Sequence, residues 1–119
     1  MQMDNVGVHF IADIHDIENY NILNTVENMK KIMDSIVDAY HFNVINKACH
    51  QFEPVGATCV YLLSESHISC HTYPERRSCY MDIFCCSESA VNFRPAMFIE
   101  IMKKVFSTCT VSYSTIKRI

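Results

Sequence analysis

Reactive side chains are concentrated in one stretch near the middle of the chain. Residues 64–75 read Ser-Glu-Ser-His-Ile-Ser-Cys-His-Thr-Tyr-Pro-Glu and supply hydroxyl, carboxyl, imidazole and thiol groups close together. Apolar segments that are typical of buried strands lie on both sides of this stretch, and packing there favours Val, Ile or Leu. Because polar side chains interrupt the hydrophobic pattern at this point, we interpret the stretch as a candidate functional site.

Taken alone, these side chains allow several kinds of chemistry. Ser66 beside His67 or His71 could form a nucleophile and its base, although the Gly-x-Ser-x-Gly turn of many serine hydrolases is absent. Cys86 and His71 could form the pair of a thiol enzyme. The same residues are also compatible with a strand whose small polar side chains only hydrogen-bond to one another. The residues by themselves leave these interpretations open.

A metal site is a further possibility that the spacing does not favour. The candidate ligands are His67, His71, Cys79 and Cys86. The chain has no Cys-x-x-Cys pair, and Cys85 is adjacent to Cys86, so the spacing matches no common zinc module. We therefore predict no metal.

Composition restricts the class of protein. The 119 residues suffice for one hydrophobic core, and with half of them hydrophobic a disordered chain is not expected. A net charge of −3 does not favour nucleic acid. No apolar stretch approaches the roughly 20 residues of a membrane span, and the start does not resemble a signal peptide. The seven cysteines then favour reduced thiols. We expect a single domain, 1–119, in the cytoplasm, binding a small molecule rather than nucleic acid or membrane.

Hydrophobic periodicity predicts an α+β fold. Helices are expected at 25–40, with Asn24 as N-cap and Glu27 completing a capping box, and at 95–106, where Pro95 suits the first turn. Strands are predicted at 5–14, 42–52, 58–63, 67–73, 79–86 and 108–116. This order predicts a two-layer sandwich, an antiparallel β-sheet with two helices packed on one face.

Four short motifs and the start of the chain occur in a characteristic order. They are Phe-x-Pro-x-Gly-x-Thr at 52–58, Glu-Ser-His at 65–67, His-Thr-Tyr-Pro-Glu at 71–75 and Asp-Ile-Phe-Cys-Cys at 82–86, preceded by Gly-x-His at 7–9 with Asp13. Their order and spacing resemble those of S-adenosylmethionine decarboxylase proenzymes of the short, prokaryotic type. The resemblance covers nearly the whole chain.

The resemblance implies autocatalytic cleavage of a zymogen. The hydroxyl of Ser66 is expected to attack the carbonyl carbon of Glu65, and His71 is the expected processing base, which removes the Cα proton of Ser66. Thr58 matches a hydroxyl position that supports processing. The expected products are a β chain, 1–65, and an α chain that begins at Ser66.

Cleavage is expected to leave a covalent pyruvoyl group, derived from Ser66, as the cofactor. Its ketone forms a Schiff base with the substrate's amine and accepts electrons as carbon dioxide leaves. Cys86 matches the family's proton donor, since a thiol is mostly protonated at neutral pH. The adjacent Cys85 leaves this assignment open by one residue, and the distance from Ser66 favours Cys86.

The substrate implied by the resemblance is S-adenosylmethionine. Phe52, Tyr73 and Glu75 match substrate-binding positions, at which two rings hold the adenine and a carboxylate accepts hydrogen bonds from the ribose. The product is decarboxylated S-adenosylmethionine, which serves polyamine (spermidine) biosynthesis. The family also implies a two-fold homo-oligomer whose site is completed across the interface.

Two alternatives on the same scaffold remain open. One is an arginine decarboxylase, and the other is a non-cleaving paralogue that acts by binding its partner subunit, although such paralogues usually lose the serine or the cysteine. The chain departs from the family pattern at Tyr73, where Trp is common, at Cys59 and Ser87, where Gly is common, and at Arg76-Arg77. These departures concern the substrate more than the mechanism.

Overall fold

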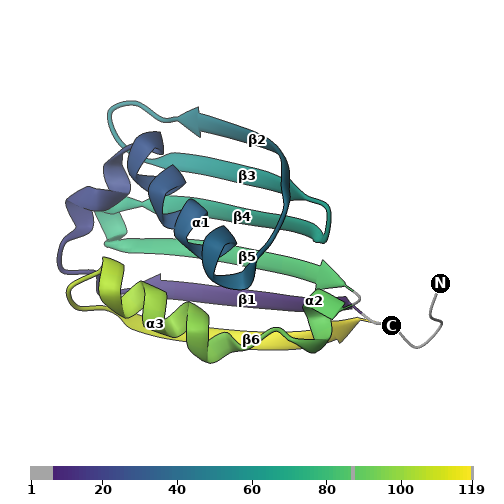
Figure 1. The fold of residues 1–119 in the computed structure, drawn as a ribbon. Coiled ribbons are helices and arrows are strands. Elements are labelled where there is room, and N and C mark those ends of the chain that lie inside the picture. Colours follow the sequence, from purple (N-terminus) through teal and green to yellow (C-terminus); the bar gives the residue numbers. More distant parts are fainter. Residues whose placement is uncertain (1–6, 87, 119) are drawn as a thin grey trace.

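Alternation of side chains along extended segments produces a sheet of six antiparallel strands in the order β2-β3-β4-β5-β1-β6 (Figure 1). The structure is a computed structural model, and it describes residues 7–86 and 88–118. The strands are β1 (Gly7–His15), β2 (Val44–Gln51), β3 (Ala57–Leu63), β4 (Ser66–Tyr73), β5 (Ser78–Cys86) and β6 (Thr110–Arg118). Ser87 and residues 5–6 of the first predicted strand lie outside the described residues.

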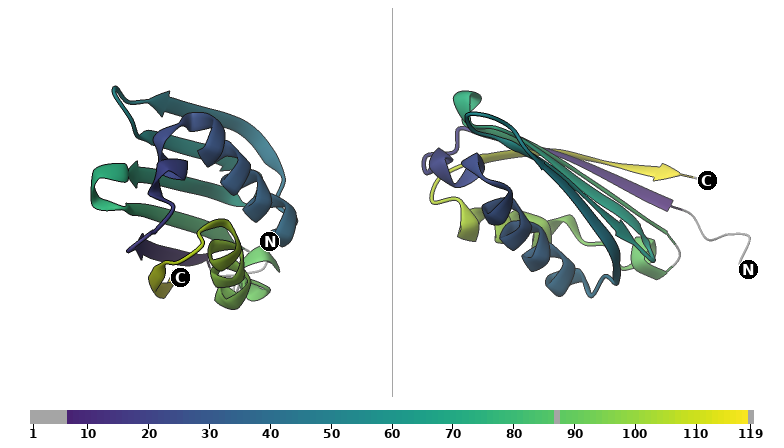
Figure 2. Two further views of the ribbon diagram at one scale, coloured as in Figure 1. Left: turned by 90° about the vertical axis from the view of Figure 1, so that its left-hand side faces the viewer. Right: turned by 90° about the horizontal axis from the view of Figure 1, so that it is seen from above.

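Two main helices, α1 (Val26–Tyr40) and α3 (Pro95–Val105), cover one face of this sheet (Figure 2). The predicted α+β fold is therefore confirmed. The sequence did not predict three short elements, η1 (Tyr20–Asn24), η2 (Pro74–Arg76) and α2 (Glu88–Val91). No helix among the described residues is long and apolar enough to cross a membrane.

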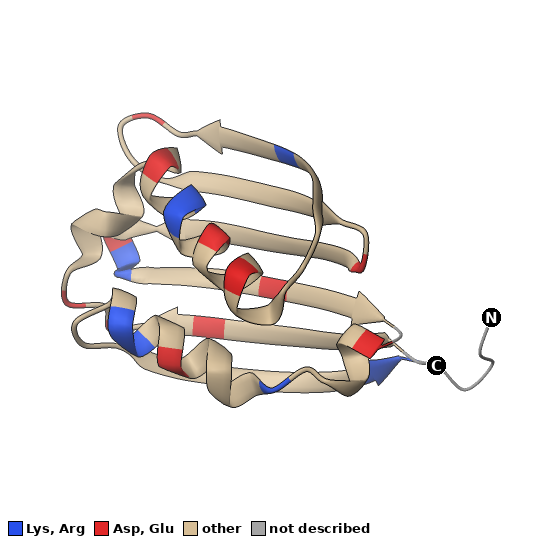
Figure 3. Cartoon of the chain, viewed as in Figure 1, with Lys and Arg blue, Asp and Glu red and all other residues tan. Residues whose placement is uncertain are grey.

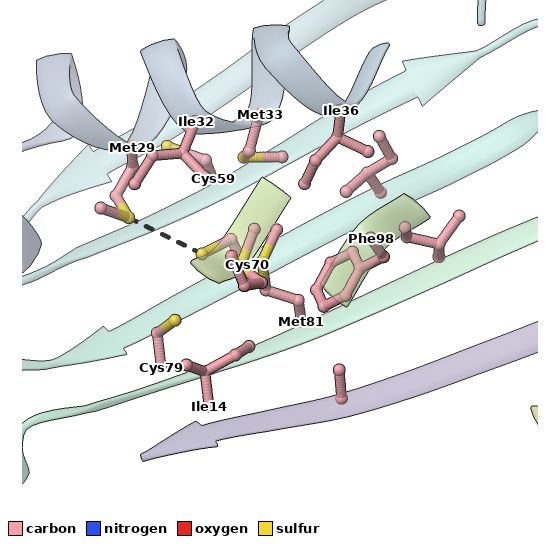
Figure 4. Close-up of a cluster of buried hydrophobic side chains, with 14 of the residues drawn as sticks. Ile14, Met29, Ile32, Met33, Ile36, Cys59, Cys70, Cys79, Met81 and Phe98 are labelled. Atoms are coloured by element: carbon pink, nitrogen blue, oxygen red, sulfur yellow. Dashed lines mark hydrogen bonds between the residues drawn. The ribbon is translucent and has the colours of Figure 1, made fainter. Parts of the chain in front are cut away.

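The core lies between the helices and the sheet and is rich in sulfur (Figure 4). The stripe that α1 presents to the sheet consists of Met29, Ile32, Met33 and Ile36, all buried. Beneath it lie Cys59, Cys70, Cys79 and Met81. The neighbouring Cys79 thiol, together with burial, holds the pKa of Cys70 well above its ordinary value. These cysteines therefore act as small hydrophobic residues.

The predicted N-cap of α1 is wrong. Thr25 caps the helix, because its Oγ1 accepts a hydrogen bond from the backbone N–H of Asn28 at 3.3 Å. Asn24 instead ends η1, and its carbonyl oxygen accepts a hydrogen bond from Gly56 N at 2.9 Å. This bond ties the start of α1 to the turn between β2 and β3. Gly56 has a φ of 111°, which favours glycine at that turn.

The opposite face of the sheet carries no helix among the described residues (Figure 2). Val60 and Leu62 of β3 are 40% and 49% exposed there. Strands β3 and β4 contain no Lys, Arg, Asp or Glu, and Figure 3 shows that much of the charge lies on the helices and turns. The part of this uncovered face that β3 and β4 form is therefore uncharged and partly apolar, whereas the neighbouring β5 adds Asp82, whose Oδ2 accepts a hydrogen bond from Ser69 Oγ at 3.4 Å.

Thr72 should contribute measurably to stability, because it is buried and its hydroxyl joins three elements. Thr72 Oγ1 donates to Leu23 O at 2.9 Å and accepts from Ala57 N at 2.8 Å. Thr72→Val keeps the shape of the side chain but leaves Leu23 O and Ala57 N without this partner. We therefore expect the free energy of unfolding, measured with urea, to fall by about 1–3 kcal/mol. The exposed position Thr115 supplies the control, since Thr115→Val should change stability by less than about 0.5 kcal/mol. Equal stability of the two variants would contradict this role.

Candidate active site

Glu65, Ser66 and Cys86 form a first group of candidate residues, which we name the turn cluster. Glu65 lies in the turn between β3 and β4, and Cys86 ends the neighbouring strand β5. The Cys86 thiol donates a hydrogen bond to the backbone carbonyl oxygen of Glu65 at 3.3 Å. A polar donor thus lies against the carbonyl that the predicted cleavage attacks.

The backbone at Ser66 is strained. Its φ is 153°, in a range that residues with side chains rarely adopt. Conformations of this kind cost about 1–3 kcal/mol and persist only where the surrounding structure imposes them. The strain lies at the residue whose preceding peptide bond is expected to break.

Cys85 and Cys86 point to opposite faces of the sheet, as successive residues of a strand do. Cys85 is completely buried on the side of the helices, and burial raises the pKa of its thiol to about 11. Cys86 is exposed and contacts the turn cluster. The geometry therefore favours Cys86 as the thiol that can exchange a proton near Ser66.

Asn43 holds the side chain of Glu65, although it belongs to none of the motifs identified in the sequence. Its backbone N–H donates to Glu65 Oε1 at 3.0 Å, and its Nδ2 donates to Glu65 Oε2 at 2.8 Å. Partial burial opposes ionisation of this carboxyl group, but the hydrogen bonds from Asn43, together with those from Ser64 and the Glu65 backbone, outweigh it and lower the pKa of Glu65. Glu65 is therefore a fixed carboxylate at neutral pH.

The remaining candidates line a pocket of about 360 Å³ at the other end of β4. Its volume lies in the range of small-molecule sites. The lining consists of Phe52, Val55, Gly56, Thr58, His71, Thr72, Tyr73 and Glu75. All the predicted substrate-binding residues are thus in one cavity, together with the predicted processing base and its supporting hydroxyl.

Thr58 and His71 are direct neighbours on β3 and β4 within this pocket. Thr58 Oγ1 and His71 Nδ1 are joined by a hydrogen bond of 3.2 Å. In the tautomer in which Nδ1–H donates to Thr58 Oγ1, the lone pair that can accept a proton is on Nε2. The pair therefore has the geometry of an oriented base.

Within one chain, His71 lies far from Ser66. Both residues belong to β4, and His71 follows Ser66 by five positions. At roughly 3.3 Å per residue, an extended strand places their backbones about 16 Å apart. The turn cluster and the pocket therefore lie at opposite ends of the same strand.

Three rings on the uncovered face lie beside the turn cluster. The ring centroids of His9 and His67 are 5.7 and 6.0 Å from that of Phe84, and 6.3 Å from each other. The Nε2 atom of His9 is buried and has no hydrogen-bond partner among the described residues. In the same part of the chain, no group of three or more His, Cys, Asp or Glu side chains could hold a metal ion.

Comparison with known proteins decides the family. A protein-family model for S-adenosylmethionine decarboxylase matches residues 8–119. The chain belongs to the S-adenosylmethionine decarboxylase family. The expected family is thereby confirmed, and with it a pyruvoyl-dependent, self-processing decarboxylase as the class of enzyme.

Individual members of the family match along most of their length. The S-adenosylmethionine decarboxylase proenzyme of Hydrogenobaculum sp. (strain Y04AAS1) is 34% identical over 108 residues, covering 85% of this chain and 80% of the relative. That of Picrophilus torridus is 33% identical over 113 residues, covering 95% and 84%. A crystal structure of the adenosylmethionine decarboxylase from Aquifex aeolicus VF5 superimposes with a TM-score of 0.80 at 25% identity, covering 96% of this chain and 91% of that one.

The residues present fit the prosthetic group of this family, which arises from a serine. Its formation requires a serine that follows a strained, attackable peptide bond whose carbonyl oxygen has a hydrogen-bond donor. Ser66 has the strained backbone, and the Cys86 thiol supplies the donor at 3.3 Å from Glu65 O.

The two adjacent thiols should differ in reactivity by at least about tenfold, because thiolate is the reactive form. With a pKa of about 11 and a buried position, Cys85 should resist iodoacetamide at pH 8, whereas the exposed Cys86 should be alkylated early. Peptide mass spectrometry after timed labelling measures the alkylation rates of both cysteines. Cys86→Ala should remove the early label and Cys85→Ala should not, and an early label on Cys85 would refute the assignment.

Proposed function

We propose that the chain is a proenzyme that cleaves itself between Glu65 and Ser66 and then decarboxylates S-adenosylmethionine for polyamine biosynthesis. The observation that carries this proposal is the hydrogen bond from the Cys86 thiol to Glu65 O, at 3.3 Å, beside the strained Ser66. A binding-only paralogue has no need for this arrangement of three reactive groups.

The first step is an attack of Ser66 Oγ on the carbonyl carbon of Glu65. Negative charge develops on Glu65 O, and the Cys86 thiol donates to this oxygen as an oxyanion-hole group does. The peptide C–N bond then breaks, the Ser66 nitrogen takes up a proton, and an ester links Glu65 to Ser66. Breaking the C–N bond also releases the backbone strain at Ser66.

The second step requires a base at the Cα proton of Ser66, and we assign it to His71. Removal of this proton expels the carboxylate of Glu65 as the new end of the β chain. Hydrolysis of the remaining enamine by water releases ammonia and leaves the pyruvoyl group at position 66. Thr58 holds the imidazole of His71 through the 3.2 Å bond to Nδ1, so that Nε2 is the acceptor.

We further propose that His71 of the partner subunit serves this step, in a two-fold homodimer. Stacking the uncovered faces of two copies, with their strands antiparallel, places the pocket end of one β4 over the turn cluster of the other. Exposed Val60 and Leu62 would be covered by this contact, which a two-fold axis makes self-complementary. Each site then combines the turn cluster of one copy with the pocket of the other.

The pocket favours an adenosyl substrate over arginine. Phe52 and Tyr73 are 47% and 39% exposed, so each ring presents surface to a planar base. Glu75 is the one carboxylate among the described lining residues, and it can accept hydrogen bonds from a ribose. A guanidinium substrate would call for more negative charge. Stacking on two rings therefore explains the pocket better than ion pairing.

Turnover uses the same residues in new roles. The pyruvoyl group supplies a carbonyl that withdraws electrons as carbon dioxide leaves the substrate. Cys86 is placed to return a proton to the substrate carbon, since its thiol already lies at the carbonyl next to position 66. Phe52 and Tyr73 fix the adenine and Glu75 the ribose.

Intact-mass spectrometry of the purified protein tests the proposed cleavage directly. We expect two chains, 1–65 and 66–119, the second beginning with a pyruvoyl group. Ser66→Ala should stay intact, and Ser107→Ala, at an exposed serine remote in sequence from Glu65, should cleave like the wild type. The cleaved protein should release carbon dioxide from S-adenosylmethionine and not from arginine. A wild-type chain that remains intact on long incubation would contradict the proposal.

Mixed subunits test the shared site. His71→Ala and Ser66→Ala chains should each remain uncleaved alone. When the two are expressed together, the His71→Ala chain should be cleaved, because its Ser66 meets His71 of the partner subunit. Each heterodimer contains one complete site, whereas homodimers of the His71→Ala chain contain none, so processing of this chain in the mixture is expected to be incomplete. Absence of cleavage in a purified heterodimer would mean that the base acts within its own chain or is another residue.

A further inference from the structure

We infer that Asn43 is a positioning residue for self-cleavage, which holds Glu65 so that its carbonyl stays in line for attack by Ser66. This inference rests on the proposed function. Three hydrogen bonds join Asn43 to residues 64 and 65: Asn43 N to Glu65 Oε1 at 3.0 Å, Asn43 Nδ2 to Glu65 Oε2 at 2.8 Å, and Ser64 N to Asn43 O at 2.9 Å. The contact thus involves both the main chain and the side chain of Asn43.

The segment that carries Asn43 is itself firmly held. The preceding Phe42 is buried, and its backbone N–H donates to Val37 O at 3.0 Å at the end of α1. The ring of Phe42 stacks on that of Tyr40, with centroids 5.5 Å apart, and the Tyr40 hydroxyl donates to Arg94 O at 2.6 Å. Asn43 therefore transmits the position of the helix layer to the turn between β3 and β4.

Two contacts on opposite sides of Glu65 then determine where its carbonyl lies. Asn43 fixes the carboxylate, and the Cys86 thiol fixes the backbone oxygen. A strained backbone such as that of Ser66 persists only where its surroundings impose it. Removing the Asn43 contact should allow the turn to relax, which lengthens the approach of Ser66 Oγ to the carbonyl carbon and slows cleavage.

The test is a time course of self-cleavage, followed by intact mass from the moment of synthesis. Asn43→Ala should slow cleavage by about 10- to 100-fold, as a misplaced reacting group does. Asn46→Ala is the matched control, because the side chain of this nearby exposed Asn only accepts a bond from Lys47 N. It should cleave within about twofold of the wild type. Thermal melting of uncleavable Ser66→Ala versions reports whether either change unfolds the chain.

A second variant separates positioning from a general structural effect. Asn43→Asp has the same shape but sets a carboxylate against that of Glu65, so cleavage should be slow at neutral pH. It should recover relative to wild type as pH falls, because one shared proton restores a hydrogen bond between the two carboxyl groups. In a Glu65→Ala background, Asn43→Ala should slow cleavage by less than a further factor of about two, since the two residues act through one contact.

The outcomes distinguish this inference from the proposed function. Equal rates for wild type and Asn43→Ala, or an Asn43→Ala effect of the same size with and without the Glu65 side chain, would overturn the role of Asn43 and leave the cleavage mechanism standing. A wild-type chain that never cleaves would overturn both.

Discussion

Strand β4 is constrained by the alternation of an extended chain, and the core and the site both depend on this constraint. Ile68, Cys70 and Thr72 point toward the helices and are buried, while His67 and His71 point to the uncovered face. One strand can therefore serve the core and the chemistry at once. The same geometry forbids it from folding back, so its two ends cannot meet within one copy.

In the proposed function, a second copy is needed because of that separation. The turn cluster holds the bond that is proposed to break, and the pocket holds the proposed base and the rings that suit a substrate. On this proposal, neither half is sufficient alone. Between them lies the part of the uncovered face that β3 and β4 form, which has no charged residue and is partly apolar, and such a surface suits contact with an identical one.

The sequence predicted the elements better than the details that join them. The stripe of α1 and the alternation in β3 and β5 extend over many residues, so their periodicity is strong, and it also places Cys85 and Cys86 on opposite faces. The N-cap was predicted at Asn24, because Asn ranks above Thr at this position, but Asn24 ends η1 and its carbonyl oxygen accepts a hydrogen bond from Gly56 N, so Thr25 caps the helix instead. Short elements such as η2 have too few residues to show a period.

Family motifs predicted the candidate residues of the site, but they could not predict that these residues lie in two separate groups. A motif gives order along the chain, whereas the distance between Ser66 and His71 depends on whether the intervening residues are extended. Asn43 carries no motif, because its contact with Glu65 joins a helix end to a turn that is remote in sequence.

The strand order has a consequence for the molecule after the proposed cleavage. The β chain would contribute α1, β1, β2 and β3, and the α chain would contribute β4, β5, α3 and β6. In the sheet, β1 lies between β5 and β6, so a strand of one fragment is enclosed by two strands of the other (Figure 1). The two fragments would thus be interwoven and could separate only by breaking the sheet. Maturation would change a chain that can fold by itself into an assembly that, once unfolded, must find its missing half by diffusion.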